Sequence, residues 1–353
     1  MAGKSGRSIA YTPERSIWKR ILSWEGALVI IFVGVLVMGR LMSASFTATN
    51  VLREMPKYLS EILIALPMGF ILIMGEIDIS VGSIVCLSAT VATFAGNAGI
   101  PFPVVILICL ATGVACGALN GFILTRWPEL PPMIVTLGTQ IIFRGIAEVS
   151  LGAGGSASYN NSADLDILGA RVGPFPVAFF VVILAAVIYI VVLAKTTFGR
   201  KLYAIGSNRT AASYAGIKVG KVRFIVYTLA GLMSAICALF ILTTTYGANT
   251  TTGQNYEMDV IAMCVFGGIA TTGGKGNLFG ALIAGFTIVC LRIALGLNNI
   301  NTQLILVIIG LLLIVSVLIS SLTQSDYFKK RRLKKAAEKR AREEAEARTN
   351  PRE

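Results

Sequence analysis

Few side chains in this sequence can act as a nucleophile, a general base or a metal ligand. Histidine is absent, which removes the commonest general base and metal ligand. The cysteines all lie inside apolar runs and none forms a C-x-x-C pair, so neither a zinc site nor a disulfide framework is indicated. We interpret all six as buried packing residues: Cys86, Cys109, Cys116, Cys237, Cys264 and Cys290. The sequence therefore predicts no catalytic site, no metal and no cofactor.

Two carboxylates interrupt the apolar sequence at residues 75–83, which read G-E-I-D-I-S-V-G-S. Carboxylates between apolar runs are costly in lipid and usually face a cavity or another protein surface. In one interpretation, Asp78 caps the helix that follows, assisted by Ser80 or Ser83. In the other, the segment is a break in a helix whose free backbone groups line a solute path, as discontinuous helices do in transporters.

Other polar residues lie within apolar runs, namely Glu61, Asn120, Thr136, Gln140, Arg144, Glu148 and Arg292. Gln140, Arg144 and Glu148 are spaced four apart, so they share one helix face. Residues of this kind can form interhelical hydrogen bonds and ion pairs, or contribute directly to a solute path. Our candidates for a translocation path are Asp78, Ser80, Asn120, Thr136 and Gln140.

A glycine-rich connection at residues 267–277, G-G-I-A-T-T-G-G-K-G-N, invites comparison with a phosphate-binding loop. With Lys275 as the loop lysine, the G-x-x-x-x-G-K-[S/T] spacing requires Gly at 269 and Ser or Thr at 276. Those positions hold Ile269 and Gly276. We therefore expect no ATP binding here and predict instead a tight helix turn with backbone packed close to backbone.

A cationic segment without any carboxylate extends from Lys195 to Arg223. Its centre can form a short helix, because Asn208 can cap a first turn at 209–212 and Gly216 can end it. A helix of about two turns is unstable alone in water. One interpretation is simply a cytoplasmic loop, since Lys and Arg are retained on that side during membrane insertion. We favour the other, a docking site for a partner on the cytoplasmic face, because small residues on the helix surface allow close approach.

The composition indicates that membrane-spanning helices position these residues. The chain of 353 residues is 55% hydrophobic and 14% charged, whereas a soluble domain carries nearer a quarter charged residues. Apolar runs of about 18 residues or more can cross a hydrocarbon core as helices. The sequence thus predicts an all-α polytopic membrane protein, with small residues at 113–121 and 280–285 favouring close helix crossings. Ten spans are expected, at 24–41, 58–74, 81–98, 103–125, 133–152, 175–195, 222–246, 256–272, 277–295 and 302–322.

The distribution of Lys and Arg along the chain predicts its orientation in the membrane. An even number of spans with both termini in the cytoplasm places most of the 31 Lys and Arg residues on that side. The chain then divides into a basic cytoplasmic segment (1–23), a transmembrane region (24–322) with its cytoplasmic loop (195–223), and a charged cytoplasmic tail (323–353). The net charge of +13 follows from this topology and requires no nucleic-acid partner. Within the tail, Lys329–Lys335 can bind anionic membrane lipid.

Two polar connections, 152–174 and 246–257, fall on the external side in this topology. Both are rich in Gly, Ser, Thr and Asn. They can meet a soluble partner or simply be solvated.

Several stretches resemble the signatures of ribose-type ABC sugar importer permeases. The segment 75–83 resembles G-G-I-D-L-S-V-G-S, and P-P-M-I-V-T-L-G-T at 131–139 resembles P-P-F-I-V-T-L-G-T. Residues 198–217 are similar to F-G-R-x-x-Y-A-I-G-G-N-x-x-A-A-x-x-S-G-I, while 256–268 and 273–281 resemble the family's closing signature. The blocks occur in the family's order and together are highly specific. Within the family, L-R-I-A-L-G-L-N-N-I near the end favours the rhamnose or autoinducer-2 branch over ribose.

The resemblance implies a transport subunit of the bacterial plasma (inner) membrane, not an enzyme. Its expected partners are two cytoplasmic ATP-binding subunits, a second permease, identical or homologous, and a periplasmic or external solute-binding protein. The resemblance makes 206–217 the coupling segment, with contacts to the ATPase at Gly206, Asn208, Arg209, Ala211, Ala212, Gly216 and Ile217. Two positions depart from the family pattern: Glu76 stands where Gly is common, and Ala215 where Ser is common.

The sequence leaves two other functions open. The first is an ion-coupled secondary transporter of a small polar solute, with Asp78 or Glu148 as the coupling carboxylate. The second is an integral-membrane enzyme, which the absence of His and of a clustered nucleophile and base opposes.

Overall fold

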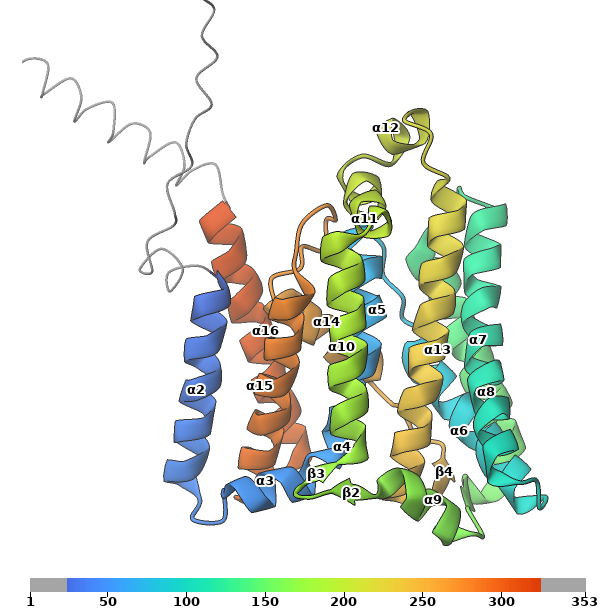
Figure 1. The fold of residues 1–353 in the computed structure, drawn as a ribbon, viewed down its shortest axis with the longest axis vertical. Helices are drawn as coiled ribbons and strands as arrows, with labels where there is room; N and C mark the ends of the chain where they lie inside the picture. The colour runs from blue at the N-terminus through green and yellow to red at the C-terminus, as the bar shows by residue number, and fades with distance from the viewer. Residues whose placement is uncertain (1–23, 325–353) are drawn as a thin grey trace, which may run out of the picture.

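The computed structural model describes residues 24–324 and shows a bundle of helices (Figure 1). The predicted segment 1–23 and residues 325–353 of the predicted tail lie outside the described part. The longer helices are α2 (Trp24–Met42), α5 (Glu61–Ile73), α6 (Val81–Asn97), α7 (Phe102–Arg126), α8 (Pro132–Leu151), α10 (Val177–Lys195), α11 (Thr197–Ser207), α13 (Val219–Thr245), α14 (Tyr256–Phe266), α15 (Leu278–Gly296) and α16 (Thr302–Gln324). The shorter elements are α3 (Ala48–Glu54), α4 (Pro56–Leu59), η1 (Gly152–Gly154), β1 (Ser156–Ser158), α9 (Ser162–Gly169), β2 (Arg171–Val172), β3 (Phe175–Pro176), α12 (Arg209–Tyr214) and β4 (Gly247–Asn249).

Each of the ten predicted spans contains a helix, and the all-helical, multi-pass class is confirmed. Between residues 24 and 324, six helical stretches are long and apolar enough to cross a membrane: Pro56–Ile73, Phe102–Arg126, Pro132–Gly154, Val177–Lys195, Val219–Thr245 and Leu278–Gly296. The helix α14 has 11 residues and is about 16 Å long, roughly half the thickness of a hydrocarbon core. The number of crossings and the side of each terminus stay predictions.

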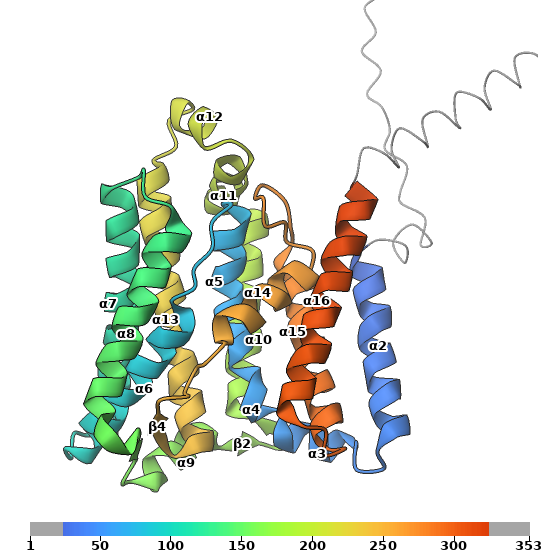
Figure 2. The same cartoon turned by 180° about the vertical axis from the view of Figure 1, so that it is seen from behind.

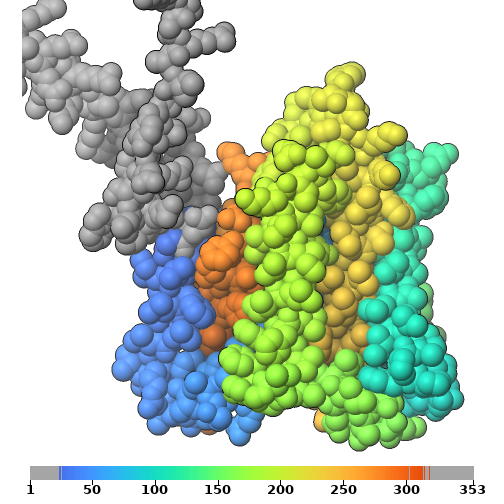
Figure 3. Space-filling model, in the orientation of Figure 1, coloured from blue at the N-terminus to red at the C-terminus, as the bar shows by residue number. Residues whose placement is uncertain are grey.

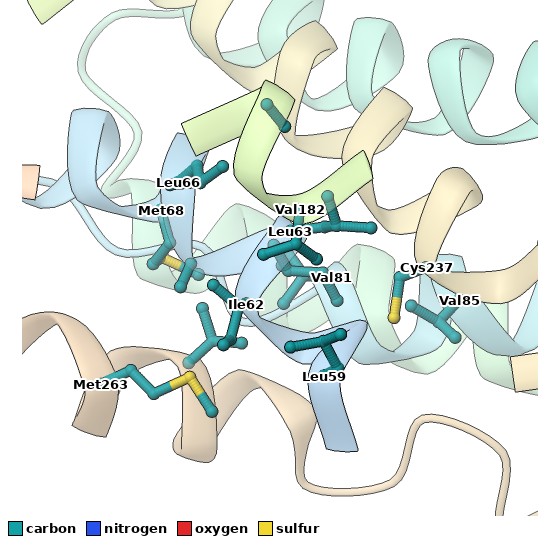
Figure 4. Packing of buried hydrophobic residues seen from close by; sticks show 14 of the residues in the cluster. Leu59, Ile62, Leu63, Leu66, Met68, Val81, Val85, Val182, Cys237 and Met263 are labelled. Atoms are coloured by element: carbon teal, nitrogen blue, oxygen red, sulfur yellow. The ribbon is translucent and has the colours of Figure 1, made fainter. Parts of the chain in front are cut away.

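The helix α5 forms the centre of the bundle. Its sequence, E-I-L-I-A-L-P-M-G-F-I-L-I, is apolar on every face after Glu61, which is typical of a helix that other helices surround. All 13 of its residues are buried, and it contacts α10, α13, α14 and α15. Figure 4 shows Leu59, Ile62, Leu63, Leu66 and Met68 of α4–α5 packed among Val81, Val85, Val182, Cys237 and Met263. The six cysteines are free and buried, as expected.

Glycines allow a close helix crossing between α7 and α13. A Cβ atom at Gly113 would lie 2.4 Å from the Gly231 carbonyl oxygen, and one at Gly231 would lie 2.1 Å from the Gly113 oxygen. Only residues without a side chain let the two backbones approach this closely. The crossing predicted from 113–121 is therefore confirmed. In the same way, Gly280 of the 280–285 run packs against Gly267, which ends α14.

The connections predicted to share a side of the membrane do lie together. At one end of the bundle, β1 pairs with β4 antiparallel, joining the two predicted external connections; β2 pairs with β3 nearby. At the other end lie α11, α12, the glycine-rich connection, and the described ends of α2 and α16 (Figures 1 and 2). This grouping agrees with an even number of crossings.

Candidate functional site

The connection between α5 and α6 is non-helical chain, most of it buried in the bundle. Non-helical backbone inside a membrane is tolerated only where protein buries it or where it lines a cavity. The Asp78 Oδ1 atom accepts hydrogen bonds from the Ser80 backbone nitrogen (2.8 Å) and hydroxyl (2.6 Å). The N-cap residue of α6 is Ser80, and its side chain makes no capping bond. Asp78 thus closes a turn before α6 and does not cap that helix, whereas the predicted break between two helices is present.

Four of the five predicted path residues meet around this turn. The Asn120 amide of α7 donates to the Ser80 hydroxyl at 2.8 Å, and the Thr136 hydroxyl of α8 accepts from the Ile79 nitrogen at 3.2 Å. Asp78, Ser80, Asn120 and Thr136 are completely buried. The cluster therefore joins α6, α7 and α8 inside the chain.

The fifth path residue, Gln140, lies one turn further along α8 and contacts a different helix. Its amide donates to Glu257 at 3.2 Å, where α14 begins. Arg144 donates to the carbonyl oxygens of Thr250 (2.8 Å) and Thr252, which lie in the connection between β4 and α14. The bond of this face that joins two helices is that of Gln140 to Glu257. Glu148, the third member of the face, is exposed.

The cationic segment forms two helices, of which the sequence predicted one. Thr196 is the N-cap of helix α11, and its hydroxyl accepts hydrogen bonds from the backbone nitrogens of Phe198 and Gly199. Its buried residues are Gly199, Leu202 and Ile205. The spacing of Phe198, Leu202 and Ile205 is that of one helix face, and it is the signal that could have predicted α11.

The predicted short helix is α12, with the expected caps at both ends. The Asn208 side chain accepts a hydrogen bond from the Ala211 nitrogen at 2.9 Å. Gly216 follows the helix with φ of 81°, in the left-handed region that favours glycine. The Gly216 and Ile217 nitrogens donate back to Ser213 and Ala212, which is a Schellman motif. Both end signals read from the sequence are confirmed.

Helix α12 projects from the bundle (Figures 1 and 3). Ala211 and Asn208 are exposed, whereas Ala212 is buried against the body of the protein. Tyr214 is 90% exposed, and sequence reasoning did not select it. A groove of about 490 Å³ separates α12 from the end of α7 and the start of α13.

Gly206, near the end of α11, packs its backbone closely against the end of α5. A Cβ atom at Gly206 would lie 1.8 Å from the Ile73 carbonyl oxygen, which also accepts from the Gly274 nitrogen at 2.8 Å. The glycine-rich connection thus packs backbone against backbone, as predicted. Nearby, the Tyr203 hydroxyl donates to the Gly276 oxygen at 2.8 Å, and burial raises the pKa of this phenol, which favours its donor form.

Sequence reasoning missed a charged cluster formed by Glu76 of the α5–α6 connection, Arg209 of α12, and Arg223 and Tyr227 of α13. We call it the Glu76 cluster. Arg223 Nε lies 2.8 Å from Glu76 Oε1, Arg209 pairs with the same oxygen, and the Tyr227 hydroxyl donates to Oε2 at 3.1 Å. The side chains of Glu76 and Arg223 are each 2% exposed, and that of Arg209 is 41% exposed. The partners lie 133 to 151 residues from Glu76, so no local pattern links them.

A second cluster joins Glu61 of α5, Asp259 of α14 and Arg292 of α15; we call it the Arg292 cluster. Arg292 Nη1 donates to Glu61 Oε1 at 3.1 Å, and Nη2 lies 2.7 Å from Asp259 Oδ2. The guanidinium also lies 5.5 Å from the centre of the Tyr58 ring, within cation–π range. Glu61 and Arg292 thus form an ion pair between helices, one of the two roles open to polar residues in the apolar runs, although the sequence did not predict which residues pair.

A multi-pass bundle with buried breaks between its helices defines the class, an integral membrane protein built in the manner of transporters. Residues 55–317 match the model of a family described as branched-chain amino acid transport system / permease component, and the chain belongs to this family.

Individual relatives agree with this family. The chain is 34% identical over 297 residues to the ribose import permease protein RbsC of Bacillus subtilis, covering 83% of this chain and 91% of that one. It is 29% identical to RbsC of Haemophilus influenzae, over 85% and 93% of the two chains. It is 28% identical to the autoinducer 2 import system permease protein LsrD of Salmonella typhimurium, over 85% and 92%. No solved structure matches the chain. The resemblance to ribose-type permeases is confirmed, and the choice of branch stays a prediction.

Proposed function

We propose that this chain is the membrane subunit of an ATP-driven importer for a monosaccharide or a similar small polyhydroxylated solute of the ribose, rhamnose or autoinducer-2 type. The observation that carries the proposal is a projecting, capped two-turn helix, α12, in a chain that belongs to a permease family. The solute is delivered by an external binding protein. ATP is hydrolysed by separate cytoplasmic subunits, and a second permease, identical or homologous, completes the membrane part in the bacterial plasma membrane.

We take 206–217 as the coupling segment, and the contacts of its residues support a different task for each group. Gly206 and Ala212 hold the segment against the body of the protein through a close backbone contact and a buried side chain. Asn208 and Gly216 shape α12 through its caps, and Ile217 donates the last bond of the Schellman motif. The exposed surface is left for the ATP-binding subunit. Ala211 and Tyr214 contribute to it, and an exposed aromatic ring is a common anchor at protein interfaces.

The translocation path passes the break between α5 and α6. Within the described residues, Asp78 Oδ2 and Asn120 Oδ1 are buried acceptors without a hydrogen-bond partner. Sugar hydroxyls are donors that such oxygens can bind when the surrounding helices separate. Each is a single weak polar contact, which suits a path because tight binding slows release.

Reconstitution with ATP-binding subunits tests the proposal. The permease is purified with candidate ATP-binding subunits and placed in proteoliposomes with a binding protein and labelled ribose, rhamnose or autoinducer-2. We expect uptake that needs ATP and survives ionophores. Uptake that needs no ATPase and stops when ion gradients collapse would instead identify the ion-coupled transporter, with Asp78 or Glu148 as its carboxylate.

A single substitution tests the docking surface. Ala211→Trp adds a large side chain at an exposed position of α12, so we expect a folded permease that no longer co-purifies with the ATP-binding subunits. Ala98→Trp, exposed after α6 near the opposite end of the bundle, is the matched control. Normal ATPase binding by Ala211→Trp would contradict the docking role. Ala212→Trp is a poorer test, because Ala212 is buried.

A further inference from the structure

We infer that Glu76 is a positioning residue of the transport cycle, through which movement of α12 reaches the break between α5 and α6. The inference rests on the proposed function, since it takes α12 as the segment that the ATP-binding subunit moves. It assigns a role to a buried carboxylate for which the sequence suggested none.

The connectivity of the Glu76 cluster supports this role. Glu76 lies two residues before Asp78, in the same non-helical connection. Its carboxylate binds Arg209, the first residue of α12, and Arg223, in the second turn of α13. Arg223 in turn donates to the Leu124 carbonyl oxygen near the end of α7. One side chain therefore joins α12 to the connection that carries Asp78 and Ser80.

The two arginines differ in what they lose when the contact breaks. Arg223 is 2% exposed, so its separation from Glu76 would leave a buried charge without its counter-ion. Arg209 is 41% exposed and lines the groove beside α12, so it can return to water at little cost. The Glu76–Arg223 pair is thus the permanent part of the cluster, whereas Arg209 can bind Glu76 and release it.

Because of this difference between the two arginines, α12 can take two positions relative to the connection between α5 and α6. With Arg209 on Glu76, the connection between α5 and α6 is held to α12. With Arg209 released, α12 moves without the connection. A partner that binds one position of α12 better than the other shifts the connection with it, as coupling between sites requires.

A cysteine reporter on the connection tests the inference. All six native cysteines are buried, and Ile77 is partly exposed beside Glu76, so Ile77→Cys supplies an accessible thiol. The full-length permease carrying it is placed in nanodiscs, and the rate of its reaction with N-ethylmaleimide is measured. The same measurement is made on complexes with the ATP-binding subunits, nucleotide-free and trapped with ATP and vanadate.

Two results are expected. In the permease alone, Arg209→Gln and Glu76→Gln each raise the reaction rate, and the double variant reacts no faster than Glu76→Gln, because both changes break one contact. In the complex, nucleotide trapping changes the rate, and Arg209→Gln reduces that change at least about fivefold, the lower end of typical coupling between sites. Arg126→Gln and Glu129→Gln are the matched controls, since both residues are exposed near the end of α7.

Three results would overturn the inference: rates in Arg209→Gln equal to those of the controls, additive effects in the double variant, or a nucleotide response that Arg209→Gln leaves intact. Arg209→Gln keeps the buried Glu76–Arg223 pair, so it answers the question even where Glu76→Gln does not fold. Failure of the parent chain to bind any ATP-binding subunit would count against the proposed function, while the measurement on the permease alone would still decide whether Arg209 holds the connection.

Discussion

The Glu76 cluster and the Arg292 cluster both consist of arginines paired with carboxylates, but in opposite ratios. In the Glu76 cluster, one carboxylate is shared by two arginines, one of which reaches solvent. In the Arg292 cluster, one arginine is shared by two carboxylates, and the side chains of all three are at most 9% exposed. The first joins a projecting helix to a non-helical connection. The second joins three helices, α5, α14 and α15, inside the bundle.

This difference in exposure separates a cluster that fixes helix positions from a cluster that can break and re-form a contact. A charge fully enclosed by protein cannot leave its partner without a desolvation cost, so the Arg292 cluster fixes helix positions. An arginine at the edge of water can exchange a carboxylate for solvent at little cost, so the Glu76 cluster can have two states. Substitutions in the two clusters should therefore differ in size and in kind.

The largest loss of stability is expected for Arg292→Gln. The substitution leaves Glu61 and Asp259 buried without their shared counter-ion, which should lower the free energy of unfolding by about 3–5 kcal/mol. Thermal unfolding of the purified permease in detergent measures this loss, with Arg126→Gln as the exposed control. A loss below about 1 kcal/mol would show that the Arg292 cluster does not hold the bundle.

Asp259→Asn should cost less, because Glu61 remains to balance Arg292. Loss of one hydrogen-bonded contact to a charged group predicts a decrease of about 1.5–3 kcal/mol in the free energy of unfolding. The same unfolding measurement compares the two variants directly. If Asp259→Asn were as damaging as Arg292→Gln, the two carboxylates would not share the arginine as the geometry suggests.

Arg209→Gln should change stability by less than about 1 kcal/mol, because the pair has one exposed member and Glu76 keeps Arg223. Its effect should appear instead as loss of ATP-driven uptake in proteoliposomes. Unfolding and uptake are measured on the same preparation. A stability loss equal to that of Asp259→Asn would remove the distinction between the clusters.

The exposed pair of Glu54 and Lys57 gives the smallest effect. The hydrogen bond from Lys57 lowers the pKa of Glu54, so this pair contributes stability above the unfolded pKa of about 4.3 and loses it as the pH falls through the lower folded value. Glu54→Gln should cost a few tenths of a kcal/mol at neutral pH. Unfolding curves at successively lower pH should show this difference shrinking in acid; a constant difference would mean that the ion pair is not its source.

The sequence predicted what neighbouring residues determine. The caps of α12 depend on Asn208 and Gly216, which lie within ten residues of each other, and the structure shows both. Apolar runs predicted a helix in each expected segment, because the length and hydrophobicity of each run can be read from consecutive residues. The close crossing of α7 and α13 likewise follows from small residues at 113–121.

What the sequence did not predict depends on distant partners. Glu76 looked like a departure from the family pattern, and its role appears only when the fold brings Arg209 and Arg223 beside it. Asp78 and Asn120 were predicted as path residues because they are polar groups within apolar runs, but only the fold shows that they share Ser80 as a hydrogen-bonding neighbour. Side-chain pairs of this kind have no periodicity to detect.

The pairing of β1 with β4 has a consequence for the end of the protein opposite α12. Backbone hydrogen bonds join the segment after α8 to the segment after α13, and the bond from the Tyr159 nitrogen to the Tyr246 oxygen extends the join. The two segments therefore cannot separate from each other while these bonds hold. A solute at this end meets one continuous surface, and any opening must either tilt the joined segments together or form at their outer edge.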